Sequence, residues 1–287
     1  MSVDERRPVS GPKAESADFL GRFREIVSDP LNLLIERHPM AGYVRDGLVM
    51  LHNGIRVAYD GPAAYYGSFS YILTINRGVH EPLEEYVFQE LLKVVPAKPA
   101  MIELGAYWSH YSMWLKSLRP EAVVHMVEPD PANIQVGRQN FARHGFDGTF
   151  VQAAVGAGHW SLDRYLQEHG ISHLDVLHSD IQGSEVEMLR DSAVALASHA
   201  IDYVFVSTHS QALHAEVIRL LGEHGYRIEV SSDFELETTS YDGLVFASSP
   251  EKAPVFPGFR PFTRVELAGL APREVLTRIL ALTSTSS

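Results

Sequence analysis

Apolar residues in this 287-residue chain follow two alternating patterns from about residue 100 onward. Short apolar runs begin at Met101, Val123, Thr149, His173 and Ile201, and stretches with helical spacing lie between them. Such alternation is typical of a doubly wound parallel sheet. Two final runs, YRIEVS and LVFASS, indicate an antiparallel end to it. We therefore predict an α/β fold with a mostly parallel, seven-stranded sheet.

The first hundred residues have a different pattern, which predicts an extension before the sheet. Helical spacing begins at Ser16 and ends before Pro30, and the stretch Gly47–Gly61 predicts a hairpin that turns at Asn53-Gly54. Four aromatic side chains follow, and we expect packing rather than a ligand-stacking wall, because aromatic clusters are usually core. They are Tyr65, Tyr66, Phe69 and Tyr71. The predicted parts are a disordered leader (1–15), a helix and hairpin extension that acts as a cap (16–98), the sheet domain (99–250) and a tail with a helix (251–287).

The stretch MIELGAYWSHYS combines a strand that ends in an acid, a glycine turn and the start of a helix. This arrangement places a ligand site at the carboxyl edge of a parallel sheet. A dinucleotide motif needs two further glycines, but Tyr107 and His110 occupy those positions after Gly105. A cofactor without a pyrophosphate therefore fits better. A second acid, Glu128, ends the next strand 25 residues after Glu103 (128 − 103 = 25).

Two motifs resemble those of FkbM-type methyltransferases, which are class I enzymes that use S-adenosylmethionine. SDIQGSEVEML is similar to D-x-E-G-x-E-x-x-x-L, and GAYWSHYS is similar to G-A-N-x-G-x-x-S. Together with EPD, they cover the core from Met101 to about Ser248. Tyr107 stands where the family has Asn, Ser109 where it has a second Gly, and Gln182 where it has Glu. The resemblance implies a Rossmann-like fold and O-methylation of a hydroxyl, often on a sugar or another natural product.

The resemblance also implies where the cofactor lies. Glu103 and Gly105 would line the methionine end, and Glu128 would accept the ribose hydroxyls. Gln152 and Ala153 end the third strand, where this fold presents residues to the adenine. The complete set of cofactor-binding residues that we expect is Glu103, Gly105, Ala106, Tyr107, Ser112, Glu128, Gln152, Ala153 and Asp180.

Two side chains qualify as the catalytic base. Asp180 ends the fourth strand and His209 ends the fifth, so both are expected at the ligand edge, next to each other. A histidine titrates near neutral pH and can take the hydroxyl proton, while an acid can orient the hydroxyl or bind the cofactor amine. Which of the two is the base stays open. Asp180 and His209, with Glu185 or Asp242, form an alternative Mg²⁺ site.

Three nearby side chains have simpler interpretations. His178 lies inside a strand, where packing is the common fate, and His214 lies on the next helix. Glu185 begins a helix, where its negative charge can interact favourably with the helix dipole and have no other role.

The composition of the chain limits the classes of partner and substrate that we expect. The chain has 24 basic and 36 acidic residues and a net charge of −12, which disfavours nucleic acid. It has no cysteine, and its first thirty residues are polar, unlike a secretory signal. We expect a soluble, cytoplasmic enzyme with a small-molecule substrate and no membrane contact, and the hairpin and terminal helix are candidate homodimer interfaces. Two alternatives stay open: a protein methyltransferase, and a non-catalytic protein of this fold that binds a metabolite or partner.

Overall fold

The chain folds into two compact units in a computed structural model that describes residues 17–156 and 159–284. Unit 1 comprises Met1–Tyr86, Ser232–Tyr241 and Phe262–Ser287, and unit 2 comprises Val87–Ser231 and Asp242–Pro261. The chain divides at different points from the predicted boundaries, because a loop from the second half and the tail join the N-terminal part. The predicted leader, 1–15, lies outside the described residues.

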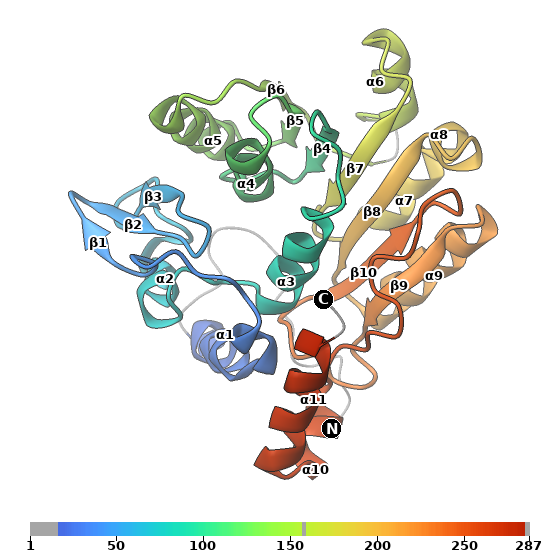
Figure 1. Ribbon diagram of the computed structural model, residues 1–287. Helices are drawn as coiled ribbons and strands as arrows, with labels where there is room; N and C mark the ends of the chain where they lie inside the picture. The colour runs from blue at the N-terminus through green and yellow to red at the C-terminus, as the bar shows by residue number, and fades with distance from the viewer. Residues whose placement is uncertain (1–16, 157–158, 285–287) are drawn as a thin grey trace. The chain divides into compact units, whose positions relative to one another are not determined.

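Unit 2 contains the seven-stranded sheet, as predicted. The strand order is β6-β5-β4-β7-β8-β10-β9, in which β6, β5, β4, β7 and β8 are parallel and β10 runs antiparallel to β8 (Figure 1). The order reverses direction beside β4, so the carboxyl ends of β4, β5 and β7 meet at one edge, where ligands bind in such sheets. The strands are β4 (Ala100–Leu104), β5 (Val123–Glu128), β6 (Thr149–Gln152), β7 (Leu174–Ser179), β8 (Ile201–Thr208), β9 (Arg227–Ser232) and β10 (Gly243–Ser248).

One face of this sheet is covered by four helices, which close the main apolar core. Side chains of the parallel strands, such as Ile102, Leu177 and Val204, pack against Leu166, Leu189 and Leu221 on these helices. The strands are buried on both faces, so they are near-continuous apolar runs rather than alternating ones. The helices are α6 (Leu162–Glu168), α7 (Glu185–Arg190), α8 (Ala193–Ala197) and α9 (Gln211–Glu223).

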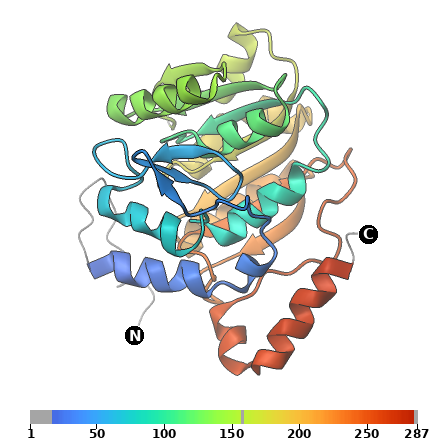
Figure 2. The ribbon, with the colours of Figure 1, turned by 60° about the vertical axis from the view of Figure 1, so that its left-hand side comes forward.

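The opposite face is covered by α4 (His110–Leu118), α5 (Pro131–His144) and the second half of α3 (Pro82–Leu91). Figure 2 shows α4 and α5 lying over the sheet. Phe88 of α3 is fully buried, and its ring contacts those of Trp114 and Phe205. Local sequence fixes the ends of α5, since Asp130 accepts a hydrogen bond from Ala132 N–H and Gly145 closes the helix at a φ of 68°.

Unit 1 contains a small antiparallel sheet and several short helices. The predicted hairpin is confirmed: β2 (Leu48–Met50) pairs with β3 (Arg56–Ala58), and β1 (Val44–Arg45) adds a third strand. The helices of this part are α1 (Ala17–Ser28), η2 (Pro30–Leu33), η3 (Gly67–Tyr71) and α2 (Ile72–Ile75).

The aromatic cluster of unit 1 is packing, as expected. Phe69 is buried at 1% exposure and stacks on Phe19 of α1, with ring centroids 4.9 Å apart. Tyr65 is also buried, whereas Tyr66 and Tyr71 are exposed. The apolar side of α1 is therefore covered by aromatic rings from residues 65–69.

The tail belongs to the same unit. It forms α10 (Arg264–Gly269) and α11 (Pro272–Ser284). Arg264 holds it in place, because its guanidinium donates to Ser28 Oγ, to the Glu25 carbonyl and to the Thr239 carbonyl. Ile279 of α11 is buried. Among the helices within the described residues, none is both long and apolar enough to cross a bilayer.

The turn after β4 has one strict requirement for a glycine. Gly105 has a φ of 72°, and a Cβ built on it would lie 1.7 Å from the carbonyl oxygen of Asp180. A backbone atom of the neighbouring strand cannot move away as a flexible side chain can. Asp180 N–H also donates to the Leu104 carbonyl at 2.9 Å, so the two strand ends are held side by side.

This contact generates a stability prediction. Gly105→Ala is expected to lower the free energy of unfolding by more than about 4 kcal/mol, because a backbone clash adds to the left-handed conformation. Gly145→Ala is the matched control: its φ is 68°, but nothing lies within 4 Å of the added Cβ. It should cost only about 1 kcal/mol. Urea unfolding of both variants measures the difference, and similar losses would contradict the proposed clash.

Candidate functional site

Three backbone amides of the turn between β4 and α4 are already bonded within the protein. Gly105 and Ala106 donate their N–H groups to the Val127 carbonyl at 2.9 and 3.1 Å, and Tyr107 N–H donates to Glu128 Oε2 at 2.9 Å. A dinucleotide site needs such amides for its pyrophosphate. These three amides already have partners on the end of β5. The structure therefore agrees with the prediction that the turn does not cradle a pyrophosphate.

Glu128 ends β5, beside this turn. Its Oε2 accepts from Tyr107 N–H, and its Oε1 accepts from Asp130 N–H at 3.0 Å and from Asn133 Nδ2 at 3.2 Å. A carboxylate has about four acceptor sites, so these three bonds leave capacity for a further hydroxyl donor. The residue is 5% exposed. Glu128 is thus a fixed acceptor at the tip of the strand.

Glu103 has a different role from the one expected. Its two carboxylate oxygens accept the N–H groups of Tyr111 and Ser112 in the first turn of α4, at 3.3 and 3.0 Å. Burial raises the pKa of the Glu103 carboxyl, and the charge of His178 and the bonds from Ser112 counteract that effect in part. Both Glu103 and Ser112 are buried. We therefore assign them to holding the helix start, not to direct contact with a ligand.

The two departures from the family motif in this turn both lie in the left-handed region. Tyr107 has a φ of 43° and Ser109 a φ of 66°. Asn and Gly, which the family has there, adopt this conformation more readily than Tyr and Ser. Ser109 is nevertheless buried, and a Cβ on Gly137 of α5 would lie 2.6 Å from its hydroxyl. The backbone path of the motif is thus kept with different side chains.

The remaining residues of the expected cofactor set differ in exposure. Ala106 is buried, Tyr107 and Ala153 are half-buried, and Gln152 is exposed. Gln152 lies beside Glu128 in the pairing of β5 with β6. The end of β6 therefore follows on from the Glu128 tip along the same edge of the sheet.

The ends of β7 and β8 bring Asp180 and His209 together, as predicted. Nε2 of His209 lies 3.1 Å from Asp180 Oδ1. Its Nδ1 lies 2.7 Å from Oε1 of Glu185, which is fully buried. Asp242, which precedes β10, places an oxygen 3.8 Å from Nε2. The imidazole is therefore surrounded by three carboxylates.

Gln182 completes this group. It has a φ of 56°, and its Nε2 lies 2.9 Å from both Asp180 Oδ1 and His209 Nε2. The turn through Gln182 and Gly183 brings the chain back, so that Gly183 N–H donates to Glu185 Oε1 at 3.0 Å. An amide can present either its oxygen or its nitrogen to the ring, whereas a carboxylate can only accept. The carboxylates therefore decide the charge of His209.

The charge of His209 bears on which of the two candidate residues can act as the base. Burial alone would lower its pKa, but the hydrogen bonds to Asp180 and Glu185 and the charges of Asp180 and Asp242 raise the pKa to about 11. For Asp180, burial alone would raise the pKa, but the hydrogen bond and charge of His209 hold it below its usual range. At neutral pH the pair is therefore imidazolium and carboxylate. His209 does not titrate near working pH and has no lone pair with which to act as a base.

The same geometry gives no support to the alternative Mg²⁺ site. Both ring nitrogens of His209 face carboxylate oxygens, which already bond to the ring. Within the part of the chain that the structure describes, neither Asp180 nor His209 belongs to a group of three closely spaced ligand atoms.

Sequence reasoning underestimated Glu185 and anticipated the two other histidines. Glu185 begins α7, but it faces His209 rather than only favouring the helix dipole. The signal was available in the D-x-x-x-x-E spacing around a glycine turn. His178 is buried with its ring 4.2 Å from that of Tyr111, and His214 is buried between Thr208 Oγ1 and Ser231 Oγ, each at 2.9 Å. His178 thus packs, as expected, whereas His214 is held by two hydroxyl groups.

A separate hollow lies at the opposite edge of the sheet. It has a volume of about 350 Å³ and is lined by Lys116, Asp147 and the start of β5, among others. The ammonium of Lys116 already has Asp147 and the carbonyls of Pro120 and Ala122 as partners. A hollow whose charged group is fully satisfied is a weaker candidate than the edge that carries Glu128 and Asp180.

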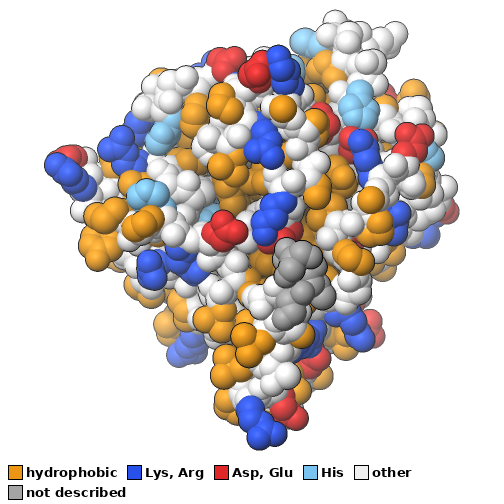
Figure 3. Space-filling view, viewed as in Figure 1, with side chains coloured by type: hydrophobic (Ala, Val, Ile, Leu, Met, Phe, Trp, Pro, Cys, Tyr) orange, Lys and Arg blue, Asp and Glu red, His pale blue; other side chains and the backbone are white. Residues whose placement is uncertain are grey.

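Surface charge is mixed on the face drawn in Figure 3. Basic and acidic side chains are scattered there among apolar ones and do not gather into one basic field. A nucleic-acid interface requires such a field.

Comparison with known proteins supports the resemblance for part of the chain. A family profile described as methyltransferase FkbM domain matches residues 158–228, which include Asp180, Glu185 and His209. The resemblance of these residues to FkbM methyltransferases is therefore confirmed. No curated protein matches the chain.

Several solved methyltransferase structures are similar to parts of the chain. A methyltransferase FkbM from Methylobacillus flagellatus KT has 17% identity over 63% of this chain and 53% of its own, with a TM-score of 0.44. A precorrin-6y C5,15-methyltransferase from Geobacter metallireducens GS-15 has 16% identity over 56% and 84%, with a TM-score of 0.42. A fibrillarin from Aeropyrum pernix, solved with S-adenosyl-L-methionine, has 14% identity over 53% and 68%, with a TM-score of 0.37. Because these scores are low, the fold assignment rests on the strand order itself.

The charge state of His209 can be tested by pH titration. The stabilisation from its raised pKa is complete below the unfolded value of about 6.5 and is lost progressively as the pH rises from there through about 11. The lowered pKa of Asp180 describes the same interaction from the acid side, where it is lost as the pH falls below 3.8. In histidine NMR spectra, the His209 ring signal should not shift between about pH 5.5 and pH 8.5. Asp180→Asn should bring its midpoint down, and a wild-type midpoint near 6.5 would contradict the ion pair.

Removing the imidazolium should cost stability. His209→Gln leaves Asp180 and the buried Glu185 without a cation, so we expect a loss on the order of 3 kcal/mol in the free energy of unfolding at pH 7. The loss should be largest at about pH 6 and smaller at about pH 9, because the unfolded chain has released the histidine proton at the higher pH while the folded chain still holds it. Urea unfolding at the three pH values measures it, and a loss that is the same at all three would contradict the raised pKa of His209.

Proposed function

We propose that this chain is an S-adenosylmethionine-dependent O-methyltransferase that acts on a hydroxyl of a small molecule, a sugar or another natural-product intermediate. The observation that carries the proposal is the fixed carboxylate of Glu128 beside a turn whose amides are already bonded. Such an edge suits a nucleoside with two ribose hydroxyls and no phosphate. The match of residues 158–228 to the FkbM domain supports the same class of reaction.

The chain's own residues fit the cofactor at two places. Glu128 would accept a hydroxyl of the ribose, and the exposed end of β6 at Gln152 and Ala153 would lie beside the adenine. Gly105 would support this edge indirectly, because its missing side chain leaves room for the Asp180 carbonyl. When bound, S-adenosylmethionine supplies a methyl group on a positively charged sulfur, which a hydroxyl oxygen can take by in-line displacement.

We assign Asp180 as the residue that binds the hydroxyl group of the methyl acceptor and takes its proton. Its bonds to Gln182 and His209 both use Oδ1, and its side chain is 30% exposed, so Oδ2 is available at the edge of the sheet. When the acceptor hydroxyl reacts, Asp180 would take its proton. The His209 imidazolium orients Asp180 and keeps it ionised before the reaction. Positioning of the two reactants supplies most of the rate, and a general base adds about 10²–10⁴-fold.

Glu128 gives the first test. Glu128→Gln replaces one acceptor oxygen by a donor, so the affinity for S-adenosylmethionine should fall by about 10–100-fold, the value of one hydrogen bond to a charged group. Asp130→Asn is the matched control, since Asp130 is a nearby acid that follows the same strand but caps α5 through Ala132 N–H. It should leave the affinity within about twofold. Calorimetry of both variants decides, and equal affinities would place the nucleoside elsewhere.

Asp180 gives the second test. Asp180→Asn should reduce turnover by about 10²–10⁴-fold. Turnover is followed as S-adenosylhomocysteine formed with a panel of sugars and phenolic compounds. A variant as active as the wild type would exclude Asp180 as the base. A wild-type protein that binds the cofactor but methylates no member of the panel would favour the non-catalytic alternative or a protein substrate.

A further inference from the structure

A second group of charged side chains lies at the amino-terminal edge of the sheet in unit 2, at the other ends of β7 and β8. His173 directly precedes β7, Asp175 is its second residue, and Asp202 is the second residue of β8. The pairs Leu174 with Ile201 and Val176 with Tyr203 place Asp175 beside Asp202. Three residues that commonly ligate metals are therefore brought together by strand register.

The two carboxylates are unusual for their position. Asp175 is 7% exposed and Asp202 is 3% exposed, although like charges on neighbouring strands repel each other and burial adds a desolvation cost. Asp175 Oδ2 has one hydrogen bond, from Ala100 N–H at 2.7 Å. Such a pair of buried acids requires a cation to be stable.

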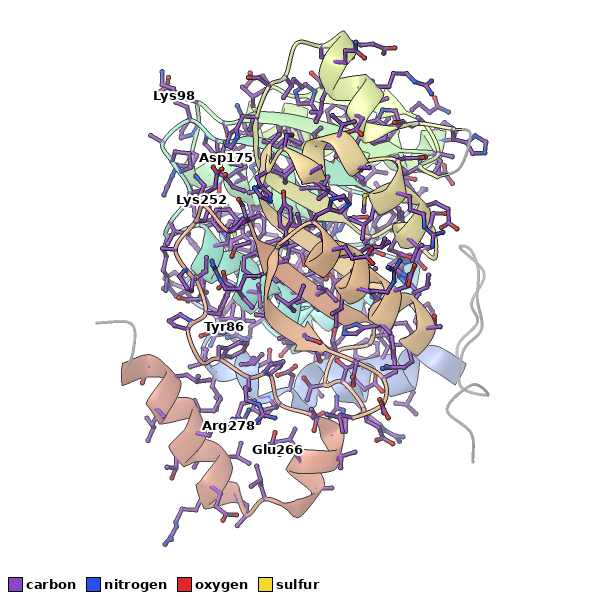
Figure 4. All side chains as sticks on the ribbon, turned by 90° about the vertical axis from the view of Figure 1, so that its right-hand side faces the viewer. Tyr86, Lys98, Asp175, Lys252, Glu266 and Arg278 are labelled. Atoms are coloured by element: carbon purple, nitrogen blue, oxygen red, sulfur yellow. The ribbon has the colours of Figure 1, made fainter. Side chains whose placement is uncertain are left out.

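In the structure, the ammonium group of Lys252 supplies part of the positive charge that these two acids require. Lys252 Nζ lies 2.7 Å from Asp202 Oδ2, and the same oxygen lies 3.1 Å from His173 Nε2. Figure 4 shows Asp175 and Lys252 near each other at this edge. The lysine head group thus marks a place where a positive charge is stabilised.

We propose that His173, Asp175 and Asp202 form a binding site for a divalent transition-metal ion such as Zn²⁺, which competes with the Lys252 ammonium. One ligand atom from each residue lies within 4.8 Å of the others. Ligands of a tetrahedral zinc ion are about 3.4 Å apart, so small side-chain rotations suffice. One imidazole and two carboxylates suit zinc, cobalt or nickel better than magnesium or calcium, which prefer oxygen alone. Water would complete the coordination.

Two features make this site independent of the proposed reaction. It lies at the opposite ends of the strands from Asp180 and His209, and none of its residues takes part in the proposed methyl transfer. Backbone contacts would keep its frame when the ion binds, since Ser249 N–H donates to the Asp202 carbonyl at 2.8 Å and Leu174 N–H donates to the Ala200 carbonyl at 2.8 Å.

The test is calorimetric titration of the full chain with Zn²⁺ alone. We expect one tight site in the wild type, and a loss of at least about tenfold in affinity for His173→Ala and for Asp202→Asn. Lys252→Met should tighten binding severalfold, because it removes the competing ammonium. Asp147→Asn is the control: Asp147 is an exposed acid that pairs with Lys116, and its loss should not change zinc affinity.

Each outcome bears on the proposal. Co²⁺ in place of Zn²⁺ should give the intense visible absorption of a four-coordinate ion, which is lost in His173→Ala. Equal zinc affinity in the wild type and Asp202→Asn would overturn the proposal, and so would weaker binding in Lys252→Met. If a carboxylate variant fails to fold, the zinc affinity of Lys252→Met still tests the proposal.

Discussion

The close approach of the β4 turn to the end of β7 is the constraint on which the candidate site depends. The carbonyl of Asp180 lies where a side chain on residue 105 would be, so only glycine lets the two strand ends lie side by side. This contact fixes the backbone of Asp180 against the turn that Glu128 holds through Tyr107 N–H. Glu128, the proposed acceptor for a nucleoside, and Asp180, the proposed acceptor of a hydroxyl proton, are therefore held at one edge of the sheet. Preorganisation of this kind is what an in-line displacement requires.

Charge balance at the same edge follows from the next two strand ends. Asp180 and Glu185 each bind one nitrogen of His209, and the ring is held as an imidazolium. The histidine therefore acts on the acid rather than on the substrate, which reverses the roles expected from their ordinary pKa values. The buried Glu185 fixes the ring from behind, and the Gly183 turn fixes Glu185. The FkbM-like motif of this chain thus holds one ionised carboxylate, that of Asp180, at the end of β7.

Periodicity predicted the fold well, because the parallel strands are buried on both faces and their apolar runs stand out. It also placed Asp180 and His209 side by side, since strand order determines which ends are neighbours. It could not show that Glu103 and Ser112 bond to each other inside the protein, because a strand-end acid has the same spacing whether it faces a helix or a ligand. Nor could it show the charge of His209, which depends on Glu185 and Asp242 from other elements. The joining of the tail to the N-terminal part was equally hidden, because it rests on long-range bonds such as those of Arg264.

The most direct measurement of the central claim is a crystal structure of the chain with S-adenosylhomocysteine. The account predicts a ribose hydroxyl within hydrogen-bond distance of Glu128, the adenine beside the end of β6, and the sulfur facing the open oxygen of Asp180. A nucleoside bound at any other edge of the sheet, or one bound here with no contact to Glu128, would contradict it.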